Sequence, residues 1–251
     1  MTAPMIMLLA IALAVGIAIG AVGVGGILLI PALASFGSLG MHEAMATALF
    51  TFFFTGLASA LLFQRRGSID WRLAVPVSLG ALCSGVAGAW ANSRLDARWL
   101  TLILGGLIVL AGLYTLRPQR GGRSPPLHAR PRAQLVFLGL VGAVVGFGSG
   151  LTGVGGPAIS VPLMVLLGFA PLPTIGASQV VQVVAALSGS IANVHYGTID
   201  YALALPLAVA QLAGVPLGVR LVHAMDAALL RRTIAFLCIV VGAWLLWRAV
   251  A

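Results

Sequence analysis

The stretch GAVGVGG spans residues Gly20 to Gly26, and a second glycine-rich stretch, GLTGVGGP, spans Gly150 to Pro157. Each lies near the middle of an apolar segment, 5–39 or 133–170, about twice as long as the roughly 20 residues that cross a bilayer as a helix. Glycine inside a helix costs about 1 kcal/mol relative to alanine. We therefore predict that each stretch breaks its helix and that each long segment forms a hairpin.

The composition indicates an all-α integral membrane protein. Hydrophobic residues make up 61% of the 251 residues and charged residues only 8%, and the mean hydropathy is +1.11. Soluble domains carry about 25% charged residues, so this chain has too few charged residues to form a water-soluble surface. Further apolar segments of spanning length are expected at 44–63, 73–91, 99–116, 174–194, 201–222 and 233–250.

The two halves of the chain resemble each other at an offset of 130 residues. RGSIDWRLAVP, which starts at Arg66, returns as YGTIDYALALP from Tyr196, and four of the five acidic residues pair at this offset. The sequence therefore predicts an internal repeat. We divide a single membrane transport domain, 1–251, into repeat one (1–116), a loop (117–132) and repeat two (133–251), each repeat being a glycine-broken hairpin plus three transmembrane helices.

The positions of the arginines predict how the repeats are oriented. All basic residues are arginines, and the central loop is the richest in them, so this loop is placed in the cytoplasm by the positive-inside rule. If both long segments are hairpins, more arginines fall on the cytoplasmic side than if each segment crosses once. The repeats are then inverted, as in many secondary transporters. The expected location is the inner (plasma) membrane, with multiple passes.

The glycine breaks are the predicted binding site. Helices that start just after Gly26 and Gly156 direct free N–H groups and the positive end of their dipoles toward the bilayer midplane, which favours an anion. The alternative is that the glycines only allow close helix packing. The glycines assigned to the substrate are Gly23, Gly25, Gly26, Gly153, Gly155 and Gly156.

Polar side chains inside the apolar segments are further candidates. Thr47, Thr51 and Thr55 recur on one helix face, and Ser178, Gln179 and Gln182 lie in the corresponding segment of the second half. Amides are costly in lipid and can donate hydrogen bonds to oxyanions. We assign all of these except Thr55 to substrate binding, with hydrogen bonding between helices or within one turn as the alternative.

The ionisable residues fall at segment ends. His42 and Glu43 are candidates for proton coupling, although an acid in a first helical turn also stabilises the helix dipole. The four paired acids follow turn residues and are expected to cap helices. These four are Asp70, Asp96, Asp200 and Asp226.

Four stretches, in their order along the chain, resemble the sulfite exporter TauE/SafE family. They are the repeated GVGG, ATALFTFFFTGLASA from Ala46, GSGLTGVGGPAISVPLM from Gly148, and GTIDYALALPLAVAQLAGVPLG from Gly197. The resemblance covers nearly the whole chain. It implies a membrane anion permease, of the 4-toluene sulfonate uptake type, that moves sulfite, sulfoacetate or sulfonates across the inner membrane.

The predicted function is a secondary transporter or exporter of a small anion, in particular a sulfur-containing oxyanion or organosulfonate, bound between the two breaks. A passive anion channel and an intramembrane enzyme are the alternatives; ionisable residues at span ends argue against the enzyme. No cofactor, metal or nucleic acid is expected. The expected partners are the anion and membrane lipid, while a coupling ion (proton or sodium) and a homo-oligomer stay open.

Overall fold

The computed structural model describes residues 3–23, 25–116, 131–224 and 227–250. Within these ranges the chain is helical and contains no strand, so the predicted all-α fold is confirmed. The predicted loop 117–132 lies outside the described residues, except for its last two positions, which begin α6. The helices are α1 (Ala3–Val22), α2 (Gly26–Phe36), α3 (Met41–Arg65), α4 (Trp71–Arg94), α5 (Ala97–Leu116), α6 (Pro131–Thr152), α7 (Pro157–Leu166), α8 (Pro171–Tyr196), α9 (Tyr201–Ala224) and α10 (Ala227–Val250).

Among the described residues, six helices are long and apolar enough to cross a membrane, namely α1, α3, α4, α6, α8 and α9. Their outward faces carry large apolar side chains, such as Leu140 and Val209. These side chains would be exposed to water in a soluble protein, whereas lipid accommodates them. The chain is a multi-pass membrane protein.

Both long apolar segments break at their glycines. Helix α1 ends at Val22 and α2 begins at Gly26, while α6 ends at Thr152 and α7 begins at Pro157. The first residue of each break, Gly23 or Gly153, has a positive φ (77° and 66°), a conformation that is strained for any residue with a Cβ.

The two hairpins are uneven. Helices α1 and α6 have 20 and 22 residues, enough to span the bilayer. In contrast, α2 and α7 have 11 and 10 residues, which is about 15–16 Å of helix and half of the hydrocarbon thickness. Each hairpin therefore pairs a full-length helix with a half-length helix.

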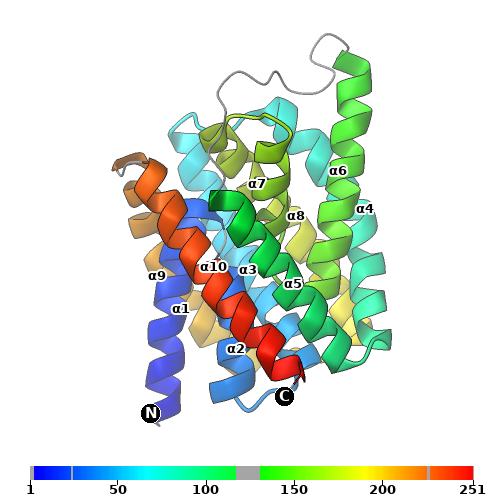
Figure 1. The fold of residues 1–251 in the computed structure, drawn as a ribbon, viewed down its shortest axis with the longest axis vertical. Helices are drawn as coiled ribbons and strands as arrows, with labels where there is room; N and C mark the ends of the chain where they lie inside the picture. Colours follow the sequence, from blue (N-terminus) through cyan, green and yellow to red (C-terminus); the bar gives the residue numbers. More distant parts are fainter. Residues whose placement is uncertain (1–2, 24, 117–130, 225–226, 251) are drawn as a thin grey trace.

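Helices at equivalent places in the two halves pack against equivalent partners. Helix α1 lies along α9, α6 lies along α4, and α5 and α10 run side by side across the front (Figure 1). Single glycines at equivalent positions also pack against equivalent residues. A Cβ at Gly88 would overlap the carbonyl oxygen of Phe147, and a Cβ at Gly218 would overlap that of Ile17. Both glycines and both carbonyls are separated by the predicted 130 residues.

One pair of helices at equivalent places, α3 and α8, runs in opposite directions. Gln182 of α8 bonds to Thr55 of α3, and further along α8 a Cβ at Gly189 would approach Leu49, which lies earlier on α3. The two helices are therefore antiparallel. The start of α1 and the end of α10 lie at the same end of the molecule (Figure 1). Inverted halves predict this arrangement, and the assignment of the central loop to the cytoplasm stays a prediction.

Candidate functional site

The two helix breaks touch each other inside the protein. A Cβ at Gly26, at the start of α2, would overlap the carbonyl oxygen of Val154 in the second break. A Cβ at Gly23 would lie 2.5 Å from the Cβ of Pro157, the first residue of α7. The structure thus brings together the two glycine stretches that lie 130 residues apart in sequence, and glycine is needed because no side chain fits between the two backbones.

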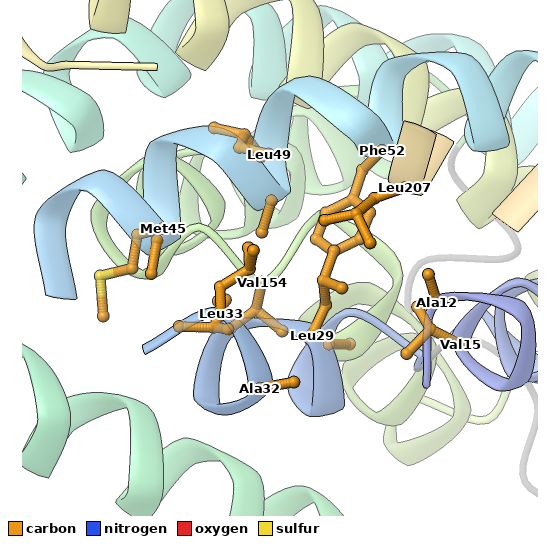
Figure 2. Close-up of a cluster of buried hydrophobic side chains, with 14 of the residues drawn as sticks. Ala12, Val15, Leu29, Ala32, Leu33, Met45, Leu49, Phe52, Val154 and Leu207 are labelled. Carbon is orange, nitrogen blue, oxygen red and sulfur yellow. The ribbon is translucent and has the colours of Figure 1, made fainter. Parts of the chain in front are cut away.

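Apolar side chains surround this contact on one side. Figure 2 shows Phe52 extending from α3 toward Leu29 of α2, with Val154 of the second break between the two helices. Phe52 is 1% exposed and Leu29 is fully buried. A Cβ at Gly26 would also lie 2.8 Å from the Phe52 ring, and a Cβ at Gly155 would lie 3.4 Å from it. Phe52 therefore contacts both breaks and excludes water from that side.

Several amide N–H groups at the breaks are buried and have no acceptor. Among the described residues, the N–H groups of Gly25, Gly155 and Gly156 form no hydrogen bond, although all three residues are buried. The Gly156 carbonyl does accept two bonds, from Ile159 N (3.2 Å) and Ser160 N (2.9 Å), and so starts α7. Buried donors without partners are costly. At the positive end of a helix, such donors suit an anion.

Two predicted amides come close to this contact. Gln179 Nε2 donates to the Ile19 carbonyl of α1 (3.4 Å) and lies 3.0 Å from a Cβ built at Gly23. Gln182 Nε2 donates to the Phe52 carbonyl (3.0 Å) and to Thr55 Oγ1 (3.2 Å). Both side chains are buried. Gln179 is therefore beside the first break, whereas the Gln182 amide joins α8 to α3.

The predicted hydroxyl groups bond to α9, to the residue that precedes α9, or within their own turn. Thr47 Oγ1 accepts from Asp200 N (3.0 Å), and Thr51 Oγ1 accepts from Gln211 Nε2 (3.1 Å), so both threonines hold α3 against α9 or its start. Ser178 Oγ donates to Ile175 O (2.7 Å) in its own turn. These bonds are the alternative considered from the sequence. The substrate role of the three residues stays a prediction.

His42 and Glu43 lie in the first turn of α3. His42 Nε2 is 2.9 Å from the Leu95 carbonyl. Met45 of α3, whose carbonyl oxygen would lie 2.6 Å from a Cβ built at Gly153 of the second break, is three positions further along, or about 4.5 Å of helix. The pair is therefore about one helical turn from the second break, and proton coupling through it stays a prediction.

Two of the four predicted caps are confirmed. Asp70 Oδ1 accepts from Arg72 N (2.9 Å) at the start of α4, and Asp200 Oδ1 accepts from Leu203 N (3.0 Å) at the start of α9. Both bonds satisfy N–H groups that have no partner inside the helix. Asp226 lies outside the described residues.

Two further buried amide side chains, Asn92 and Gln211, were not among the candidates chosen from the sequence. Asn92 of α4 donates to the Leu151 carbonyl (2.7 Å), in the last turn of α6 before the second break, and to Met45 Sδ (3.2 Å). Gln211 of α9 is fully buried. The available signal was the presence of an amide in an otherwise apolar span, but that signal does not show which helix the amide faces.

Comparisons with known proteins find relatives that are named as membrane transporters. A probable membrane transporter protein of Bacillus subtilis, YdhB, is 28% identical over 240 residues, covering 92% of this chain and 96% of the relative. A probable membrane transporter protein of Xylella fastidiosa (strain 9a5c) is 26% identical over 246 residues, covering 94% and 92%. No solved structure matches.

The names of these relatives indicate membrane transporters rather than enzymes, and their bacterial sources suggest the plasma membrane. The family model of the sulfite exporter TauE/SafE family matches residues 8–245, a range that includes both helix breaks and nearly all of the described helices. This match extends over both halves of the chain and agrees with the motifs that carry the resemblance. The chain belongs to the sulfite exporter TauE/SafE family and is a membrane transporter.

Proposed function

We propose that this transporter is a secondary transporter of a small anion, bound where the two helix breaks meet, and that the anion is a sulfur-containing oxyanion or organosulfonate. The observation that carries the proposal is the group of buried N–H donors at Gly25, Gly155 and Gly156, which have no acceptor among the described residues. The family name supports the sulfur chemistry of the substrate.

The N–H groups at the breaks favour an anion over a neutral ligand. A hydrogen bond to a charged group contributes about 1.5–3 kcal/mol, and the positive ends of the α2 and α7 dipoles add to this attraction. The Pro157 ring removes one backbone donor at the start of α7, so the available donors are concentrated at Gly155 and Gly156. Neutral sulfur compounds lack the negative charge that these groups would stabilise.

The contact between the breaks also suggests how access is controlled. In the structure, Gly26 lies against the Val154 carbonyl and Gly23 lies against Pro157, so an anion reaches the N–H groups only when the two backbones separate. We infer that the halves move relative to each other around this contact, which exposes it to one side of the membrane at a time. The inverted repeats and the cytoplasmic central loop are part of this proposal.

A passive channel is the alternative function. A channel needs a continuous path that stays open, whereas the breaks here close on each other through backbone contacts. Flux that saturates with anion concentration would support the transporter, and flux that rises linearly would support the channel. A proton or sodium gradient that drives uphill movement would identify the coupling ion.

The experiment compares two glycines that share a backbone conformation. Gly155 and Gly67 both have positive φ (86° and 64°), so alanine strains both by about 1–2 kcal/mol. Gly67 is exposed, with nothing within 4 Å of an added Cβ. Purified wild type, Gly155→Ala and Gly67→Ala are screened by thermal shift against sulfite, sulfoacetate, isethionate and taurine, and any hit is followed by proteoliposome flux.

We expect both variants to lose similar thermal stability. Only Gly155→Ala should also lose anion affinity, by roughly tenfold or more, because its methyl group occupies the approach to the unpaired N–H groups. If Gly155→Ala binds the anion as tightly as Gly67→Ala does, the breaks are not the binding site.

A further inference from the structure

A buried hydrogen-bond acceptor beside the first break has no donor among the described residues. Gln179 is fully buried, and its Oε1 has no hydrogen-bond partner. The nitrogen of the same amide donates to Ile19 O (3.4 Å) and lies 3.0 Å from a Cβ built at Gly23. The amide group of Gln179 therefore lies beside the first break. An unsatisfied buried acceptor costs free energy unless another group supplies a proton donor.

The orientation of this amide is fixed by its neighbour. The Ile19 carbonyl can only accept, so it requires the Nε2 side of Gln179. Rotating the amide by half a turn would place Oε1 against this carbonyl oxygen, which would keep its bond from Gly23 N (2.8 Å) but would then face a second acceptor. The unsatisfied oxygen is therefore a consequence of the α1 backbone, and side-chain rearrangement within the amide does not remove it.

Where the two breaks meet there are thus two kinds of buried hydrogen-bonding group that have no partner among the described residues. Gly155 and Gly156 present donors, and Gln179 presents an acceptor. We propose that the transported ligand carries both complements, namely an oxyanion and a separate hydroxyl or ammonium donor, and that Gln179 Oε1 accepts from that donor. Gln179 is then a residue that determines specificity. This inference rests on the proposed function, because it names the substrate class of the same site.

Sulfonates that differ only at the far end separate this inference from simple anion binding. Isethionate ends in a hydroxyl, whereas 1-propanesulfonate has a methyl group in the same place and is otherwise the same size. A sulfonate group satisfies the break N–H groups in both ligands. Only isethionate can donate to Gln179, and 1-propanesulfonate leaves Oε1 buried without a partner.

A second glutamine provides a matched control. Gln211 is also fully buried, its Oε1 is also unsatisfied, and its Nε2 is held by Thr51 Oγ1 at 3.1 Å. However, the backbone of Gln211 packs against Gly16 of α1, two helical turns before Gly23. Gln→Met keeps the length of the side chain and removes the acceptor at either position.

The experiment measures the affinity of purified wild type, Gln179→Met and Gln211→Met for the two sulfonates by isothermal titration. We expect wild type to prefer isethionate by roughly tenfold, the discrimination of one hydrogen bond against an unsatisfied buried acceptor. Gln211→Met should keep this preference. Gln179→Met should bind both ligands with nearly equal affinity.

Each outcome decides the question. Equal affinities in wild type would overturn this inference and leave the proposed anion site intact, and this comparison needs no variant to fold. A preference that survives in Gln179→Met would also overturn it, because the acceptor would then lie elsewhere. If wild type binds neither sulfonate, the sulfonate substrate in the proposed function fails and the inference fails with it.

Discussion

Replacing two glycines that occupy equivalent positions should destabilise the protein by equal amounts. Gly88 of α4 packs against α6, and Gly218 of α9 packs against α1. In both cases an alanine Cβ would overlap a carbonyl oxygen. It would also lie 2.9 Å from Leu151 N or 2.8 Å from Ala21 N, and both distances are shorter than ordinary van der Waals contact.

The magnitude follows from these contacts. The obstructing atoms belong to helix backbones, so they cannot rotate away, and each helix pair must separate by on the order of 1 Å. Overpacking of this kind costs about 1–3 kcal/mol. Alanine at Gly106 of α5 meets nothing within 4 Å, so that variant should be neutral, or more stable by up to about 1 kcal/mol from helix propensity.

The assay is reversible unfolding in mixed detergent micelles, with thermal stability as a second readout. We expect Gly88→Ala and Gly218→Ala to lose similar amounts of stability and Gly106→Ala to lose none. A large difference between the first two variants would show that the halves do not pack equivalently. Destabilisation by Gly106→Ala as large as that of the other two would refute the contact argument itself.

Further predictions concern the second break and the membrane topology. Asn92→Leu should cost about 1–3 kcal/mol of stability in the same unfolding assay, because it leaves the buried Leu151 carbonyl without its donor. Ser93→Ala, whose hydroxyl bonds within its own turn, should change stability by less than about 0.5 kcal/mol. Equal losses in the two variants would exclude a role for the Asn92 bond. Single cysteines at 68 and 198, on a cysteine-free background, should react with an impermeant thiol reagent from opposite sides of the membrane. Reaction from the same side would rule out inverted repeats.

Much of the fold could be predicted from the sequence because lipid restricts the choices. A backbone that crosses a bilayer must satisfy its own hydrogen bonds, so apolar segments of spanning length predict helices, and glycine clusters inside double-length segments predict where those helices break. The acids at positions 70 and 200 were expected to cap helices, and they do so. Each of these predictions depends only on local sequence and the solvent.

The partners of the buried polar groups could not be predicted in the same way. In an almost entirely apolar helix, periodicity does not distinguish the face that meets lipid from the face that meets another helix. The bond between Thr51, which we assigned to the substrate, and Gln211 could therefore not be predicted. Asn92 gave no sign that it meets the end of α6. It could also not be predicted that α2 and α7 are only about half as long as a spanning helix, because both segments stay apolar beyond the helix ends.

The most direct test of the central claim observes the unpaired N–H groups during binding. Protein labelled with ¹⁵N-glycine in detergent micelles is titrated with isethionate, and the amide signals are followed by NMR, with Gly155→Ala used to assign one of them. We expect saturable downfield shifts of the Gly155 and Gly156 amide protons, with the same Kd as the thermal stabilisation, while the Gly67 and Gly106 signals stay in place. Saturable binding that leaves the Gly155 and Gly156 signals unchanged would contradict this claim.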